Sequence, residues 1–165
     1  MIVRDLIEKL SLLPHPEGGY FRETYRSTLN IPAESLSEGI SDERSLATCI
    51  YYLLTHDDFS AFHRIKSDET WHHYSGEALT IYIIDIEGVL RTVTLGNDIQ
   101  AGQIPQCTIP AGCWFAAQLK NCSGYCLVGC TVYPGFDFRD FEMAQKEELI
   151  QRYPHNKEVI QLLTK

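Results

Sequence analysis

Between residues 46 and 133 the chain alternates short apolar runs with turn-forming residues, and this alternation restricts the fold more than any other feature. The runs are rich in β-branched and aromatic residues, so each one predicts a strand. With an aromatic run nearer the N-terminus they give roughly eight or nine short strands, which is typical of a β-sandwich or barrel. The predicted strands cover residues 20–26, 47–54, 59–65, 71–74, 79–84, 90–95, 106–109, 113–119 and 125–133.

Helical patterns flank this β-rich region on both sides. Apolar residues at helical spacing predict a helix over residues 2–12, and a second pattern predicts short helices within residues 138–163. The polar segment 27–44 contains Pro and Gly and is expected to be a loop. We expect one mainly-β domain over residues 1–165, with its barrel at about residues 20–133, because the chain shows no linker or repeat.

Charge and composition restrict the classes of partner that the protein is expected to bind. The formal net charge is −8, which argues against nucleic acid or an anionic membrane as a partner, because both attract basic surfaces. Charges interrupt the apolar run at the N-terminus, so it predicts neither a signal peptide nor a membrane span, and a cytoplasmic location is expected. The cysteines form no Cys-x-x-Cys pair and are expected to be reduced and structural; they are Cys49, Cys107, Cys113, Cys122, Cys126 and Cys130.

The stretch of residues 62–76 concentrates the side chains that could carry chemistry, with three of the six histidines and two carboxylates. Side chains alternate along a strand, so Glu69 and His73 share one face, and a hairpin at residues 66–68 would place His63 opposite them. Such a trio could bind a divalent metal with open positions for a substrate. The same three residues could instead act without metal as general acid and base.

Other residues of the predicted strands are candidates for a ligand pocket. Most aromatic residues of a small barrel form its core, yet some can wall a pocket, and inward polar residues usually face a ligand or water. Tyr133 is a catalytic candidate that could return a proton to a substrate, and His15 lies in a proline-flanked turn that could line the pocket. The ligand-binding candidates are Arg22, Trp71, Trp114, Phe115 and Gln118.

The histidine-rich stretch resembles the first motif of the cupin superfamily. That motif runs His-x-His, three or four residues, Glu, six residues and Gly, and the chain has His63, Glu69 and Gly76 at similar places. Pro110-Ala111-Gly112 is similar to the Pro-x-Gly of the second cupin motif. Further stretches are similar to one branch, the domain-of-unknown-function 985 family or cupin_5 group, over residues 14–26, 62–72 and 134–138.

This resemblance implies a double-stranded β-helix, the jelly-roll cupin barrel, usually paired as a homodimer. It implies structural kinship to deoxythymidine-diphosphate-sugar epimerases and to seed-storage cupins, but no assigned activity. Of the four usual metal ligands only His63 and Glu69 remain, because Ile65 and Phe115 stand where histidines would be. His73 as a third ligand is an inference from strand parity and not a rule of the family.

Three functions stay open on this sequence. The first is a metal-independent epimerase or isomerase acting on a sugar, of the nucleotide-sugar kind, or on a similar polyol, with His63 as the base and Glu69 or His73 orienting it. The second is a non-catalytic protein that binds a small ligand in the barrel, and the third is a metal-dependent cupin enzyme. No cofactor is favoured, and the chain contains no P-loop, dinucleotide-binding or Gly-x-Ser-x-Gly motif.

Overall fold

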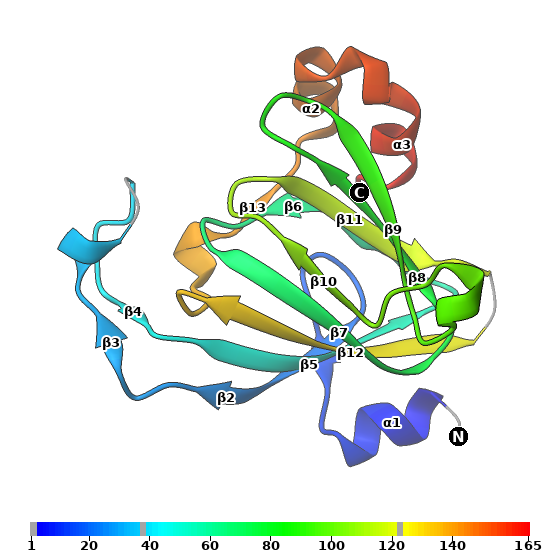
Figure 1. Ribbon diagram of the computed structural model, residues 1–165, viewed down its shortest axis with the longest axis horizontal. Coiled ribbons are helices and arrows are strands. Elements are labelled where there is room, and N and C mark those ends of the chain that lie inside the picture. Colours follow the sequence, from blue (N-terminus) through cyan, green and yellow to red (C-terminus); the bar gives the residue numbers. More distant parts are fainter. Residues whose placement is uncertain (1–2, 37–38, 122–123) are drawn as a thin grey trace.

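The computed structural model describes residues 3–36, 39–121 and 124–165, and two antiparallel β-sheets form the layers of a jelly roll (Figure 1). The six-stranded sheet has the order β1 (Leu13–Pro14), β2 (Tyr20–Arg26), β5 (Thr48–Thr55), β12 (Tyr125–Tyr133), β7 (Asp68–Gly76) and β10 (Gln106–Ile109). The five-stranded sheet has the order β13 (Glu142–Met143), β6 (Ser60–Arg64), β11 (Trp114–Leu119), β8 (Leu79–Ile84) and β9 (Leu90–Leu95).

Shorter elements cover the outer faces of this sandwich. Helix α1 (Val3–Lys9) packs on the six-stranded sheet, and helices α2 (Lys146–Arg152) and α3 (Lys157–Leu162) pack on the five-stranded sheet. Strands β3 (Asn30–Ile31) and β4 (Arg44–Ser45) pair with each other in an arm that extends away from the sheets (Figure 1). Single 3-10 turns lie at Ala33–Ser35, Ile99–Ala101, Phe138–Asp140 and Pro154–Asn156.

The alternation of side chains along each strand divides the core into three clusters. The largest contains inward side chains of both sheets, Trp71 and Phe115 among them. Phe62 and Trp114 point the other way and meet the C-terminal helices, while Leu53 packs under helix α1. Each large apolar side chain that is fully buried contributes about 1.5–3 kcal/mol. Residues next to one another in sequence therefore lie on opposite faces of a layer.

The all-β jelly-roll prediction is confirmed, and several strand boundaries agree with it. The strands predicted at residues 20–26, 79–84, 90–95, 106–109 and 125–133 coincide with β2, β8, β9, β10 and β12. The predicted hairpin between β8 and β9 is present and fully antiparallel. Turn residues and β-branched runs are local signals, which explains why these elements could be predicted.

Several local predictions are wrong. Residues 66–68 form no hairpin, because β6 and β7 belong to different sheets. Residues 138–145 are not helical: a 3-10 turn and β13 occupy them, since the edge of β6 supplies backbone partners, and α2 starts only at Lys146. Segment 27–44 includes β3 and part of β4, and the N-terminal helix ends at Lys9. Residue 2 and Cys122 lie outside the described residues.

In the part of the chain that the structure describes, no helix has the length and apolar character needed to cross a membrane. The five cysteines in that part are unpaired, and Cys113, Cys126 and Cys130 are buried. Burial raises the pKa of the Cys126 thiol to about 12. These thiols therefore behave as small apolar core residues, as the sequence predicts.

Candidate functional site

A cavity of about 290 Å³ lies between the sheets, walled by β2, β5, β6, β7 and β12, the turn before β2 and the segment of residues 136–141. Its walls combine aromatic rings with a few titratable groups, which is the usual composition of a small-molecule site. Glu17, His63 and Glu69 are buried and form the inner end, whereas Glu23 and Arg26 are exposed and mark the mouth.

At the inner end, His63 and Glu17 form a buried pair. His63 Nε2 lies 3.1 Å from Glu17 Oε2, and the two side chains are 3% and 7% exposed. Ser60 Oγ donates a hydrogen bond of 2.9 Å to Glu17 Oε1. His15 Nδ1 lies 3.3 Å from the same oxygen, Glu17 Oε2. The carboxyl group is thus held by side chains from two separate parts of the chain.

The contacts of His63 determine the tautomer of its imidazole ring. Its Nδ1 lies 2.8 Å from the backbone oxygen of Ala61, and a carbonyl oxygen only accepts, so Nδ1 carries a hydrogen. With its hydrogen on Nδ1, the neutral ring turns the lone pair of Nε2 toward the carboxyl group of Glu17, 3.1 Å away. Nε2 can therefore act as a base, and Glu17 is placed to pair with the ring once Nε2 has taken up a proton.

The turn of residues 14–19 positions Glu17 against β6. The N–H of Ala61 donates a hydrogen bond of 2.9 Å to the backbone oxygen of Glu17. Gly18 has a φ of +121°, and a Cβ there would lie 2.1 Å from the backbone oxygen of Phe59. Only glycine allows this close approach, which explains why a Pro-Glu-Gly-Gly sequence precedes β2.

Glu69 supplies a second carboxyl group to the same cavity. Glu69 is 7% exposed, and Trp71 Nε1 donates a hydrogen bond of 3.0 Å to Glu69 Oε1. Burial, reinforced by the negative charge of Glu17, raises the pKa of Glu69 to about 8. Glu69 therefore carries its proton at neutral pH and can donate a hydrogen bond or a proton to a ligand.

Replacing Glu69 with Gln is expected to flatten the pH dependence of stability between about pH 5 and pH 8. In this window the unfolded carboxyl is ionised, while the folded one, with its pKa raised to about 8, keeps its proton. The folded state then binds more protons, so wild-type stability falls as pH rises, by at most about 1.4 kcal/mol per pH unit. Urea unfolding at several pH values measures this slope. Glu87→Gln, at an exposed turn, is the control, and equal slopes in wild type and Glu69→Gln would contradict the assignment.

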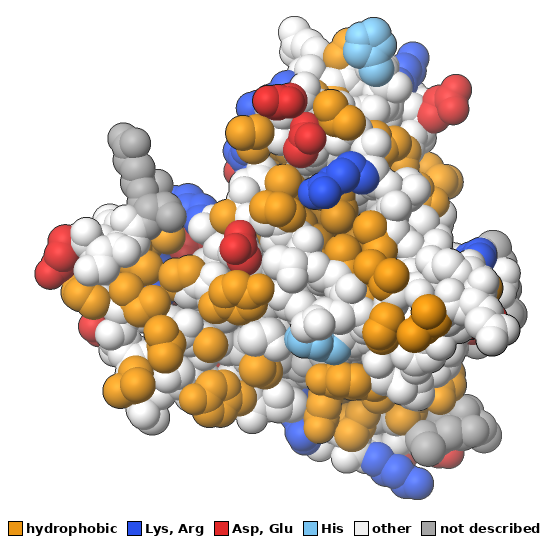
Figure 2. All heavy atoms as spheres, viewed as in Figure 1, with side chains coloured by type: hydrophobic (Ala, Val, Ile, Leu, Met, Phe, Trp, Pro, Cys, Tyr) orange, Lys and Arg blue, Asp and Glu red, His pale blue; other side chains and the backbone are white. Residues whose placement is uncertain are grey.

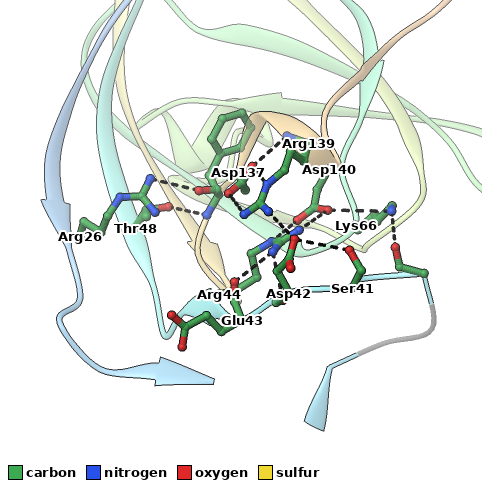
Figure 3. Close-up of polar contacts among 12 residues, drawn as sticks. Arg26, Ser41, Asp42, Glu43, Arg44, Thr48, Lys66, Asp137, Arg139 and Asp140 are labelled. Atoms are coloured by element: carbon green, nitrogen blue, oxygen red, sulfur yellow. Dashed lines mark hydrogen bonds and ion pairs between the residues drawn. The ribbon is translucent and has the colours of Figure 1, made fainter. Parts of the chain in front are cut away.

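Polar contacts hold the segment of residues 136–140 at the mouth of the cavity, and Figure 3 draws those made by Arg26, Thr48 and Arg44. Arg26 donates to both carboxylate oxygens of Glu23, at 3.0 and 2.7 Å, and to the backbone oxygen of Phe136 at 3.0 Å. The N–H of Phe136 donates to Thr48 Oγ1 at 2.9 Å. These bonds fix the segment whose phenylalanine rings form the outer wall.

A buried ion pair ties the arm to the same segment. Arg44 Nε and Nη2 donate to the two carboxylate oxygens of Asp140 at 2.7 and 2.9 Å, and each side chain is 4% exposed. Arg139 contacts Asp42 and Asp137 at the surface of this network (Figure 3). The outer wall of the cavity is therefore anchored from two directions.

The structure brings together some of the predicted site residues. His63, Glu69 and Trp71 line the cavity, His63 from the five-stranded sheet and the other two from the sheet opposite. The ring of Phe115 lies 4.1 Å from the ring of His63, centroid to centroid, and belongs to the core that supports it. His15 also lines the cavity, through the proline-flanked turn.

Four predicted site residues point away from the cavity, because neighbours along a strand face opposite sides. Tyr133 and Arg22 are on the outer face of the six-stranded sheet, where the Tyr133 hydroxyl lies 2.6 Å from Thr70 Oγ1. Trp114 packs under the C-terminal helices, and Gln118 donates a hydrogen bond to a tyrosine hydroxyl on that same outer side. None of the four can contact a ligand held with His63.

His73 does not join His63 and Glu69, so the predicted metal trio is not assembled. Four residues of extended strand separate Glu69 from His73, a span of about 13 Å. His73 Nε2 lies instead 3.1 Å from the backbone oxygen of Glu77. Among the described residues no group of three or more His, Cys, Asp or Glu has the arrangement of metal ligands. The divalent metal that the cupin fold suggests therefore does not fit these residues, and we derive no step through it.

Sequence reasoning missed Glu17, Tyr52 and Cys130, which also line the cavity. Glu17 belongs to the same proline-flanked turn as His15, which the sequence already marks as a candidate wall of the pocket. Its position beside two prolines and two glycines could therefore have identified it as a site residue. Tyr52 and Cys130 point inward from central strands, and nothing in their local sequence distinguishes them from core residues. Three phenylalanines that follow the Pro-Gly turn also line the cavity, and two of them, Phe138 and Phe141, fall in the segment predicted to be helical.

Comparisons with known proteins agree with this architecture. The family model of the cupin superfamily group Cupin_5 (DUF985) matches residues 4–144. The crystal structure of protein SO0799 from Shewanella oneidensis is 41% identical, with a TM-score of 0.88, covering 100% of this chain and 98% of that one. Uncharacterized protein YML079W of Saccharomyces cerevisiae is 30% identical over 157 residues, 88% of this chain and 77% of its own length.

A more distant likeness concerns the fold alone. Oxalate decarboxylase from Bacillus subtilis is 16% identical, with a TM-score of 0.55, over 91% of this chain and 36% of that one. Its β-sandwich thus has the same arrangement as the one described above. With a family model that extends over most of the sequence and relatives that match along nearly its whole length, the chain belongs to the Cupin_5 (DUF985) family of the cupin superfamily.

Proposed function

We propose that this protein is a metal-independent isomerase or epimerase that moves a proton on a carbon next to the carbonyl group of a small sugar-like molecule. The observation that carries the proposal is the buried His63–Glu17 pair, which shares one cavity with the protonated carboxyl of Glu69. Two titratable sites in different protonation states are what a proton transfer between a carbon and an oxygen requires.

In this proposal His63 Nε2 removes the proton from the carbon, while Glu69 gives its proton to the carbonyl oxygen. The products of this step are an enediol, a protonated His63 paired with Glu17, and an ionised Glu69. His63 then returns its proton to the neighbouring carbon while the hydroxyl on the first carbon gives a proton to Glu69, and the isomer results. Tyr133, the sequence-based candidate for returning a proton to the substrate, has no part in this proposal because it lies on the outer face.

The test is turnover by protein treated with a chelator. Proton NMR follows a panel of free aldoses, ketoses and inositols, incubated one at a time with the wild type and with Glu17→Gln. Conversion of at least one compound to an isomer, lost in Glu17→Gln, is the expected result. Conversion that requires added metal, or that Glu17→Gln leaves unchanged, would contradict the proposal.

Binding without turnover is a second candidate, favoured by the rings at the mouth of the cavity. Phe136, Phe138 and Phe141 are packed edge to face, with centroids 5.0 and 5.9 Å apart for successive rings, and they offer contact area but no proton. A compound that raises the melting temperature equally in wild type and His63→Gln, with no product formed, would favour this candidate.

We also propose a homodimer in the cytosol. The arm and its surroundings expose Tyr25 (54%), Leu29 (66%) and Leu46 (46%), and Figure 2 shows hydrophobic side chains gathered over this part of the molecule. Unpaired cysteines support a reducing compartment. Leu29→Asp is expected to shift a dimer toward monomer in sedimentation experiments, whereas Leu162→Asp, exposed on α3, is not. A monomeric wild type would end the dimer proposal.

A further inference from the structure

The cavity is poor in available positive charge. Among its lining residues in the described chain, four carry carboxyl groups, and Arg26 is the one that carries a fixed positive charge. Glu17 is paired with His63 at 3.1 Å, Glu69 holds its own proton, and Asp137 is paired with Arg139 at 2.7 Å. What an anion would meet on entering therefore depends mainly on Arg26.

Arg26 is already engaged. Its Nε and Nη2 donate to the two oxygens of Glu23, and Nη2 also donates to the backbone oxygen of Phe136. This is the two-point geometry in which a guanidinium would otherwise bind a phosphate or carboxylate. Glu23 and Arg26 both line the cavity, so the pair stands at the mouth as a neutral unit.

We propose that Glu23 is a specificity-determining residue: by occupying Arg26 it makes the cavity select an uncharged ring-shaped ligand and reject the phosphorylated form. The proposal rests on the proposed function for the identity of the ligand, but its anion discrimination concerns binding alone. It departs from the expectation of a nucleotide-linked sugar, because such a ligand brings a diphosphate, and the one guanidinium among the described lining residues is already paired with Glu23.

Shape points to the same class of ligand. The volume of about 290 Å³ lies just below the range of roughly 300–1,000 Å³ found for ligand pockets, which suits one ring better than a nucleotide sugar. The apolar face of such a ring can stack on aromatic walls while its hydroxyls meet His63, Glu17 and Glu69. The aromatic walls are Phe21, Tyr52, Trp71, Phe136, Phe138 and Phe141.

The test is a gain of anion binding in Glu23→Gln. Inorganic phosphate and glucose 6-phosphate are titrated at low ionic strength into the full chain, and NMR shifts are followed. The variant frees the guanidinium of Arg26 and is expected to bind phosphate about tenfold more tightly than the wild type. The further change Arg26→Gln in the same protein should remove the gain.

Glu142→Gln is the matched control. Glu142 accepts from Arg64 at 2.7 Å outside the cavity, so this variant also frees an arginine and changes the net charge by the same amount. An equal gain in both variants would mean a general charge effect and would overturn the proposal, as would no gain in Glu23→Gln. Wild type that binds glucose 6-phosphate more tightly than glucose would overturn it too. None of these outcomes depends on turnover, so they are separable from a failure of the proposed function.

Discussion

Replacing His63 with Gln is expected to lower the turnover of an accepted substrate about 10²–10⁴-fold, the usual contribution of a positioned acid–base group. The basic atom at the inner end of the cavity is His63 Nε2, which lies 3.1 Å from Glu17 Oε2. Gln can still donate a hydrogen bond toward the backbone oxygen of Ala61 but cannot take up a proton. The loss should fall on kcat more than on KM, because the group acts on the reacting proton.

His155→Gln is the control for this variant, since His155 is exposed next to the C-terminal helices. Circular dichroism and thermal unfolding establish that His63→Gln is folded before rates are compared. A folded His63→Gln protein that retains more than about a tenth of wild-type kcat would remove His63 from the role of base.

Replacing Arg44 with Met is expected to lower the free energy of unfolding by about 3–5 kcal/mol, because it leaves the carboxylate of Asp140 buried without its partner. Both side chains are 4% exposed and joined by two hydrogen bonds. Lys66 Nζ, 3.9 Å from Asp140 and half-exposed, is too loosely placed to replace the guanidinium. Urea unfolding followed by fluorescence measures the change.

Two further variants separate this effect from a general loss of charge. Arg4→Met removes an exposed pair with Glu8 on helix α1 and is expected to cost no more than about 0.5 kcal/mol. The double variant Arg44→Met, Asp140→Leu removes both buried charges and should recover much of the stability lost in the single variant. Equal stability of wild type and Arg44→Met would show that the pair does not anchor the outer wall.

The fold was predictable from the sequence because its signals are local. Alternating strands, the turn at Glu87-Gly88 and the Pro-Gly after β12 each identify an element without reference to the rest of the chain. The helix predicted at residues 138–145 is wrong because the structure of this segment depends on β6, a strand distant in sequence that pairs with β13. The supposed hairpin at residues 66–68 failed because sequence does not tell whether successive strands share a sheet.

The site was predictable only in part. Strand parity correctly places His63 and Ile65 in the cavity wall, and it places Glu69 with Trp71. Parity gives a direction but not a distance, so it could not show that His73 lies too far along β7. Glu17 reaches His63 from a turn more than forty residues earlier, and such a contact is visible only once the sheets are assembled.

The central claim is that the His63–Glu17 pair moves a proton between a carbon and the solvent without a metal. The most direct measurement is solvent exchange: chelator-treated protein is incubated with free sugars in D₂O, and deuterium on carbon is followed by NMR. We predict that the wild type incorporates deuterium at the carbon next to the carbonyl of its substrate and that His63→Gln does not. Incorporation that persists in His63→Gln, or that appears only after a divalent metal is added, would contradict the claim.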